Sequence, residues 1–232
     1  MASWNWKETA TAGFDIVAYT GNATDGRTVA HSLSAVPAMM IVKNRDADIK
    51  WAVYHQKNTA APETDHLKLN TDDATADDDS TWNDTAPTSS VFSVGGSTST
   101  NGDGTAYIAY LFAEKKGYSK FGSYAGNNNA NGPFIYLGFK PAWLMVKKYT
   151  GANHWIIWDN KRSTKDGFNV IDKKLYANLS HAENGANDID FLSNGFKFKT
   201  NTGDWNESES YIYMAFAENP LVTSTGIPAT AR

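Results

Sequence analysis

The feature that most constrains this chain is that it repeats itself. The run AYIAYLFAE at residues 106–114 returns as SYIYMAFAE at residues 210–218, an offset of 104 residues. Ordered matches at one offset indicate two copies of one structural unit. Further matches at this offset are Val36–Lys43 with Lys140–Lys147, Trp51–Tyr54 with Trp155–Trp158, and Phe92 with Phe196.

The duplication sets the expected domain organisation. We predict a first module over residues 1–115 and a second over residues 116–218, joined almost without a linker. The remaining residues, 219–232, contain two prolines among small polar residues. A chain end of this composition is typically loosely held, so we expect an extended C-terminal tail.

The repeated segments have the character of β-strands. Trp51–Tyr54 and Trp155–Trp158 are short apolar runs, and turn-forming residues follow the second of them directly. Such runs favour buried strands, whereas the alternation of apolar and basic residues in Gly195–Lys199 favours a half-solvated strand. No segment of about twelve residues has a capped helical period. We therefore predict an all-β chain of two tandem homologous antiparallel β-sandwich modules, jelly-roll-like in type.

Composition excludes several classes of protein. The 232 residues contain no cysteine, which excludes disulfides, thiolate metal sites and cysteine nucleophiles. A net charge of −4 without a basic block argues against nucleic acid as a partner. No apolar run approaches the ~20 residues of a membrane span, so no membrane insertion is expected. The N-terminus lacks a basic region followed by an apolar run, which predicts synthesis in the cytoplasm without a signal peptide.

The sequence nominates no catalytic centre. Its five histidines are not spaced as metal ligands, and His55 of the first copy is replaced by Asp159 in the second. The metalloprotease, nucleophile-elbow and P-loop motifs do not occur. A glycosidase pair remains open because carboxylates are abundant, although no pair stands out. We expect a protein that is not an enzyme and that needs no cofactor, with calcium as the one hypothesis left open.

The calcium hypothesis rests on an acid-rich stretch. Six aspartates lie among the fourteen residues 71–84, and carboxylate oxygens are the ligands that calcium prefers. The stretch lacks the regular spacing of an EF-hand loop and has no counterpart in the second copy, so a solvated acidic loop is the alternative. The candidate calcium ligands are Asp72, Asp73, Asp77, Asp78 and Asp79.

Two tryptophans in polar loops are candidate ligand-binding residues. An indole beside an amide and a carboxylate can pack on a sugar face while its neighbours bond the hydroxyls. The alternative is that each indole folds back over its own module or a neighbouring subunit. The two loops do not fall at the repeat offset, so they are not copies of one site. The candidates are Trp82, Asn83 and Asp84 in the first loop and Trp205, Asn206 and Glu207 in the second.

Several segments resemble a repeated C-terminal β module of tail-fibre and other virion structural proteins from tailed phages of marine and other environments. The most specific segment is Trp82–Gly95, and the resemblance covers nearly the whole chain. The other segments that carry it are Gly13–Gly21, Trp51–Tyr54, Tyr107–Ala113, Gly117–Tyr124 and Gly226–Arg232. The family supplies no catalytic or binding residues to carry over.

The resemblance implies a virion protein, tail-fibre-like or part of another exposed appendage. Its expected partners are other virion proteins and host cell-surface polysaccharide, and a homotrimer is expected by analogy with fibres. Two alternatives stay open. The first is a capsid decoration or tail assembly protein without a glycan site, and the second is a polysaccharide depolymerase.

Overall fold

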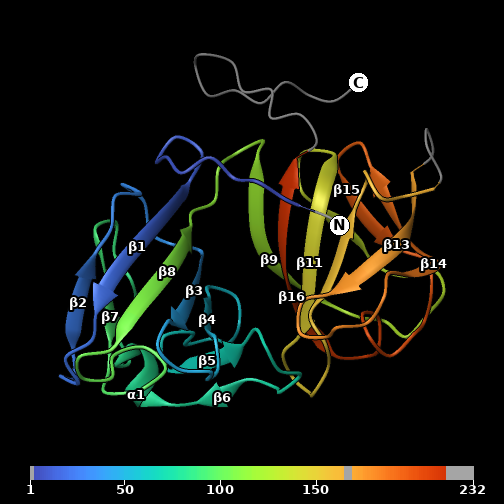
Figure 1. Cartoon of the computed structure of the whole chain (residues 1–232). Helices are drawn as coiled ribbons and strands as arrows, with labels where there is room; N and C mark the ends of the chain where they lie inside the picture. The colour runs from blue at the N-terminus through green and yellow to red at the C-terminus, as the bar shows by residue number, and fades with distance from the viewer. Residues whose placement is uncertain (1–2, 165–168, 218–232) are drawn as a thin grey trace. The chain divides into compact units, whose positions relative to one another are not determined.

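The computed structural model describes residues 3–164 and 169–217 and is nearly all β, which confirms the predicted fold class (Figure 1). The chain divides into two compact units. Unit 1 comprises Met1–Leu69 and Thr75–Glu114, and unit 2 comprises Asn70–Ala74 and the chain from Lys115 onward. The predicted tail, 219–232, lies outside the described residues. Within the described ranges, no helix is long and apolar enough to cross a membrane.

Unit 1 contains two antiparallel sheets and one short helix. The larger sheet has the strand order β1-β8-β3-β4-β5-β6, and the smaller sheet pairs β2 with β7. The elements are β1 (Phe14–Thr20), β2 (Arg27–Ala30), β3 (Met39–Asn44), β4 (Ala52–His55), β5 (Asp65–Lys68), β6 (Ala76–Asp77), α1 (Asp79–Trp82), β7 (Val91–Val94) and β8 (Ala106–Phe112).

Unit 2 contains one antiparallel sheet of eight strands in the order β10-β15-β14-β13-β12-β11-β16-β9. Its strands are β9 (Ser119–Ala125), β10 (Phe134–Tyr136), β11 (Pro141–Lys148), β12 (Ile156–Asp159), β13 (Val170–Tyr176), β14 (Asn184–Leu192), β15 (Gly195–Phe198) and β16 (Ser210–Ala217).

The two units repeat one strand order. Each strand of unit 1 corresponds to the strand eight places later, and every pairing in unit 1 has its counterpart in unit 2. The one difference is that β14 pairs with β15 in unit 2, whereas β6 does not pair with β7 in unit 1. There β6 is only two residues long, and the helix α1 intervenes before β7. The acid-rich stretch thus lies where strand pairing is interrupted in unit 1, so that the strands form two sheets there and one continuous sheet in unit 2.

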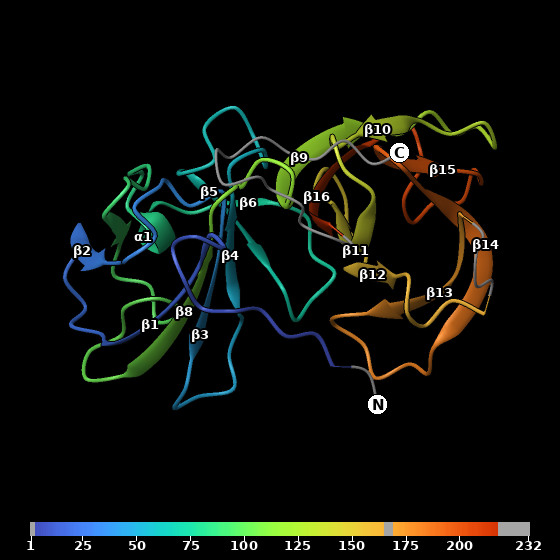
Figure 2. The same cartoon turned by 90° about the horizontal axis from the view of Figure 1, so that it is seen from above.

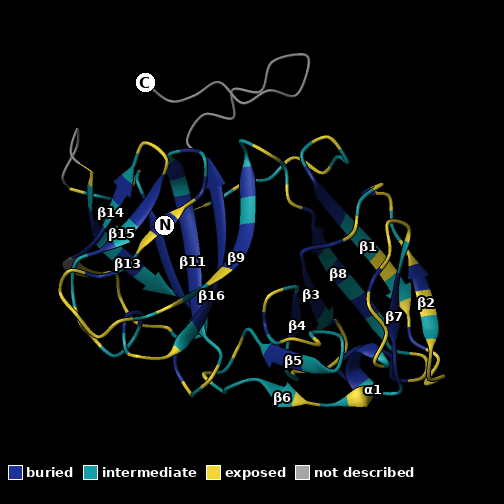
Figure 3. Ribbon diagram, turned by 180° about the vertical axis from the view of Figure 1, so that it is seen from behind, coloured by how far each residue is buried: buried dark blue, intermediate teal, exposed yellow. Residues whose placement is uncertain are grey.

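In unit 1 the core lies between the two sheets. Alternate residues of β8, Tyr107, Ala109 and Leu111, are fully buried, as the period of two along a strand requires. They share one apolar cluster with Phe92 and Val94 of β7 on the smaller sheet. Figure 3 shows buried positions along the strands and exposed ones in the connecting loops. This is the two-layered core of a β-sandwich.

In unit 2 a single sheet encloses the core by curling. Tyr124 of the edge strand β9 packs against Phe196 and Phe198 of β15, with ring centroids 6.3 and 5.3 Å apart. Because β15 lies beside the opposite edge of the sheet, these contacts bring its two ends together. Figure 2 shows the strands of unit 2 following one another around this core, with β9 beside β10.

Candidate functional site

The first predicted binding loop places its indole in the core of unit 1. Trp82 ends α1, and its side chain is only 1% exposed. Asp78 caps the helix, since its carboxylate accepts hydrogen bonds from the Ser80 backbone N–H and the Thr81 hydroxyl, both at 3.0 Å. The Trp82 ring then meets Tyr54 of β4 edge to face, with centroids 6.1 Å apart.

The second predicted binding loop does the same in unit 2. Trp205 lies between β15 and β16 and is also 1% exposed. Its indole N–H donates to Thr200 Oγ1 at 3.0 Å, and its ring meets Trp158 of β12 edge to face at 5.5 Å. Lys174 Nζ, which pairs with Asp188 at 3.1 Å, lies 4.1 Å from the centre of the Trp205 ring.

The two indoles therefore fill corresponding places in the two cores, although they enter from different connections. Tyr54 and Trp158 occupy the same position in the repeat, and each receives one indole edge to face. Trp82 arrives from the β6–β7 connection and Trp205 from the β15–β16 connection. The prediction that these indoles pack on a sugar is wrong for this structure, because neither ring offers a solvent-exposed face. The alternative, that each covers its own module, is confirmed by their burial.

Asn206, another predicted binding residue, is a fully buried structural amide. Its Oδ1 accepts the Asn127 backbone N–H at 3.0 Å, and its Nδ2 donates to the carbonyls of Asn129 and Thr200, both at 2.8 Å. The side-chain amide of Asn206 is therefore engaged in hydrogen bonds within the protein. Asn206 is corrected from a ligand-binding to a loop-holding residue.

Unit 1 contains the same device, built around the fully buried Asn101. Its Oδ1 accepts the Asn22 backbone N–H at 3.0 Å, and its Nδ2 donates to the Thr24 carbonyl at 2.9 Å. Beside each amide stands a stacked tyrosine pair. Its rings are 5.2 Å apart for Tyr19 and Tyr107, and 4.9 Å apart for the corresponding Tyr124 and Tyr211 in unit 2.

A glycine completes the device in both copies. A Cβ on Gly21 would collide with the carbonyl oxygen of Gly102, and one on Gly126 with that of Glu207. The two backbones pass so closely that only glycine fits. We call the buried asparagine, the tyrosine pair and this glycine the loop frame.

The loop frames hold loops of different chemistry. In unit 1 the held loop runs from Asn22 to Asp25 and leads to an acidic hollow of about 240 Å³, which Asp79, Asn83 and Asp84 also line with Ser80. In unit 2 the held loop is Asn127–Asn131, which contains four asparagines and is exposed throughout. Of the six predicted ligand-binding residues, the structure thus gathers only Asn83 and Asp84 at one hollow.

The predicted calcium ligands do not form one cluster. Asp72 and Asp73 belong to unit 2, whereas the other three belong to unit 1. There Asp77 is exposed on β6, Asp79 lines the acidic hollow and Asp78 caps α1. Among the described residues, no three His, Asp or Glu side chains are placed to hold a metal ion. The geometry of the described residues therefore does not support the calcium prediction.

Asp78 shows what one of these carboxylates does instead. Burial by itself would raise the pKa of Asp78, but hydrogen bonds from Ser80 and Thr81 outweigh it and hold the pKa below its ordinary value. Lys50 and the buried His66 lie 3.7 and 3.8 Å from the same carboxylate. Burial, together with the Lys50 ammonium, lowers the pKa of His66 to about 4. His66 is therefore neutral at pH 7, and Asp78 is an ionised helix cap.

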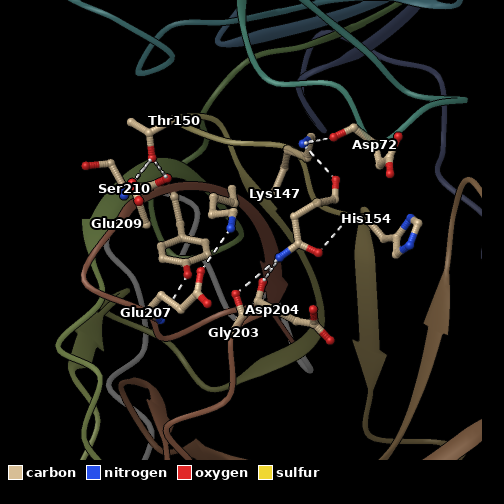
Figure 4. A network of polar contacts seen from close by, with 12 residues as sticks. Asp72, Lys147, Thr150, His154, Gly203, Asp204, Glu207, Glu209 and Ser210 are labelled. Atoms are coloured by element: carbon tan, nitrogen blue, oxygen red, sulfur yellow. Dashed lines mark hydrogen bonds and ion pairs between the residues drawn. The ribbon is translucent and has the colours of Figure 1, made fainter.

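Asp72 takes part in a polar network of unit 2 through its backbone (Figure 4). Its carbonyl accepts the Asn153 N–H at 2.7 Å and the Lys147 ammonium at 3.1 Å. Lys147 is fully buried and also donates to the Asn153 carbonyl at 2.8 Å. The Asn153 side chain in turn donates to the Asp204 carbonyl at 2.8 Å. Burial lowers the pKa of Lys147 to about 8.

Glu207, the last predicted binding residue, lies in the same network. Its carboxylate pairs with Lys148 at 2.9 Å, and its backbone N–H donates to the Tyr211 hydroxyl at 3.0 Å. Thr150 donates to the neighbouring Glu209 at 2.7 Å. Glu207 thus anchors the chain just before β16, beside the loop frame of unit 2.

Sequence reasoning missed the largest exposed aromatics of the described chain. Phe134 and Tyr136 on β10 are 45% and 60% exposed. The alternation F-I-Y was the available signal, because it places two aromatics on one face of a short strand.

One family model matches residues 1–220, and its description is a domain of unknown function, DUF7483. No curated protein matches the chain, and no solved structure does.

Proposed function

The chain belongs to the DUF7483 family, whose function is unknown. From its loop structure, together with the resemblance of its sequence to phage proteins, we propose that it is a display protein of a tailed-phage virion. In this proposal it forms part of a tail fibre or another exposed appendage, and its loops and strand faces bind host-surface glycan or neighbouring virion subunits. The location in a virion rests on the resemblance of Trp82–Gly95 and the other segments to virion proteins.

The observation that carries the display role is the pair of loop frames. Both frames use a buried asparagine that accepts a backbone N–H from the corresponding position, a stacked tyrosine pair, and a glycine packed against a carbonyl oxygen. The loops that they hold differ, since one leads to an acidic hollow and the other is a run of exposed amides. A rigid scaffold that presents variable loops is the arrangement typical of binding proteins.

Glycan is the partner that the amide loop favours. Exposed asparagine side chains supply donors and acceptors that match sugar hydroxyls. Repetition of a weak site around a symmetry axis would strengthen binding without new contacts, which agrees with the trimer expected for a fibre. A decoration or assembly role without a glycan site remains the second proposal, to be separated by experiment.

The experiment has two arms. Immunogold labelling of intact particles locates the chain, and an adsorption assay asks whether the isolated chain competes with the phage for host cells. The informative variant is Asn128→Gly with Asn131→Ala, which removes two exposed amides. Glycine suits position 128 because the backbone there has φ 48°. The exposed Val36→Ala in unit 1 is the control.

We expect labelling on an appendage and competition that the loop variant weakens and the control does not. Labelling without any competition supports the decoration or assembly role. A particle that lacks the chain overturns the proposal, and release of reducing ends from host polysaccharide supports a depolymerase instead.

A further inference from the structure

The outer face of β10 carries an exposed aromatic surface that the fold does not require. Ile135 points into the core and is buried, whereas Phe134 and Tyr136 lie on the opposite face. The corresponding strand of unit 1 is β2, because Val29 pairs with Phe92 as Ile135 pairs with Phe196. In β2 the two outward positions are held by Thr28 and Ala30. The same strand pairing therefore forms without aromatics at these positions.

Phe134 has a partial structural role and Tyr136 a smaller one. A Cβ on Gly195, across from Tyr136 on β15, would lie 3.0 Å from the Phe134 ring, so this ring covers the glycine. The Tyr136 hydroxyl would lie 3.4 Å from a Cβ placed on Gly138, so only the tip of this side chain is near that glycine. With 60% of its surface exposed, Tyr136 presents most of a ring to solvent.

The backbone edge of β10 that lies beside β9 already bonds a lysine. Lys120 of β9 donates from its ammonium to the Tyr136 carbonyl at 2.9 Å, and its Nζ lies 5.4 Å from the Tyr136 ring centre. A lysine on an edge strand opposes the pairing of a further strand. This disfavours strand addition at the edge and leaves the face of the rings as the surface open to an occupant.

The surroundings of the rings are cationic. Lys197 faces Phe134 across the β10–β15 pair and donates to the Gly132 carbonyl at 2.7 Å. An ammonium has three N–H donors, so Lys120 and Lys197 each keep donors for a ligand after these single bonds. Asp190, the next residue across the sheet, is already paired with Lys199 at 3.2 Å. Two half-buried lysines thus lie beside the rings, although the chain as a whole carries a net charge of −4.

We propose that the outer face of β10 is a binding site for an acidic polysaccharide. The apolar C–H face of a pyranose ring packs on Tyr136, with Phe134 beside it. The carboxylates of the sugar chain accept hydrogen bonds from Lys120 and Lys197. The exposed amides of Asn127–Asn131, which lead into β10, lie next along the chain to bond sugar hydroxyls. This site deepens the proposed display function and rests on it for its biological meaning.

Calorimetric titration of the full chain tests the site in solution. The acidic probe is a galacturonic acid hexamer, and maltohexaose is the neutral probe of equal length. Tyr136→Ala is expected to weaken binding of the acidic probe about tenfold or more. Tyr136→Phe should bind as the wild type does, because it keeps the ring. Val36→Ala is the matched control, since Val36 is an exposed apolar residue of unit 1, 54% exposed.

Charge is tested separately from the ring. Lys120→Gln should weaken the acidic probe, and raising NaCl from about 50 to about 500 mM should do the same through screening. Unchanged circular dichroism and thermal midpoint show that each variant is folded.

Three results would overturn the site: wild-type affinity in Tyr136→Ala, equal affinity for maltohexaose, or self-association that Tyr136→Ala abolishes. The last would show that a second copy of the chain covers this face. These outcomes are independent of the particle experiment. If Tyr136→Ala abolishes binding of the acidic probe but host adsorption survives, the phage does not depend on this site for adsorption, and the display function stands. A particle without the chain removes the display function and leaves the calorimetric result intact.

Discussion

Asn206→Ala is the sharpest test of the loop frame. The substitution removes one accepted bond, from the Asn127 N–H at 3.0 Å, and two donated bonds, to the carbonyls of Asn129 and Thr200 at 2.8 Å. Leaving a buried polar group unpaired costs about 1–3 kcal/mol. The three partners are only part-buried and regain some water, so the low end applies to each. We expect a loss of about 3 kcal/mol in the stability of unit 2.

Hydrogen exchange measured by mass spectrometry across a urea series resolves this loss within the chain. Peptides from Asn127–Asn131 and from β16 should lose protection at lower urea, while peptides from unit 1 serve as an internal reference. Asn101→Ala should reverse the pattern, because Asn101 makes two of the corresponding bonds in unit 1, with the Asn22 N–H and the Thr24 carbonyl. Asn131→Ala, an exposed amide on the held loop, is the control.

A loss below about 1 kcal/mol for Asn206→Ala would refute the reasoning. Equal effects from the buried and the exposed asparagine would refute it as well, since burial is the cause that we assign.

Other outcomes follow from the same structure. Trp205→Ala should cost about 3–5 kcal/mol by opening a cavity in unit 2, as calorimetry would show, and an unchanged melting transition would contradict its burial. Gly126→Ala should lower the yield of folded protein, because its Cβ meets the Glu207 carbonyl oxygen; normal expression and melting would show that the backbones can separate. Burial lowers the pKa of His66 from 6.5 in the unfolded chain to about 4, so the folded state binds fewer protons between these values. The stability of unit 1 should therefore be fully present above pH 6.5 and fall as the pH drops toward 4, and urea midpoints that stay flat over this range would contradict it. Lys147→Met should leave the stability of unit 2 at pH 7 unchanged or slightly higher, because it removes a fully buried ammonium. A large fall in the urea midpoint would show that the two hydrogen bonds of Lys147 outweigh the cost of its desolvation.

Local pattern was sufficient for the strands and the duplication. Trp51–Tyr54 and Trp155–Trp158 were predicted as strands, and the structure has β4 and β12 over all but the first residue of each run. The matched runs predicted two homologous sandwiches, and the strand order repeats in both units. These features depend on the spacing of neighbouring residues, which a linear sequence displays directly.

The candidate site could not be predicted in the same way. Trp82 and Trp205 looked like loop residues because their neighbours are polar, yet both indoles are core. Their partners, Tyr54 and Trp158, lie far away in the sequence. The acid-rich stretch looked like a metal loop, but its first aspartates belong to unit 2 and Asp78 caps a helix in unit 1.

What the sequence by itself determined is therefore the β class, the two copies and the segments that form strands, because strand propensity and side-chain period act over a few neighbouring residues. Only the tertiary structure decided which loop residues are buried, which asparagine holds a loop and which aromatics remain exposed on β10. Those outcomes depend on contacts such as that of Asn206 with Asn127, which lie far apart in the sequence and are brought together by the pairing of β9 with β16.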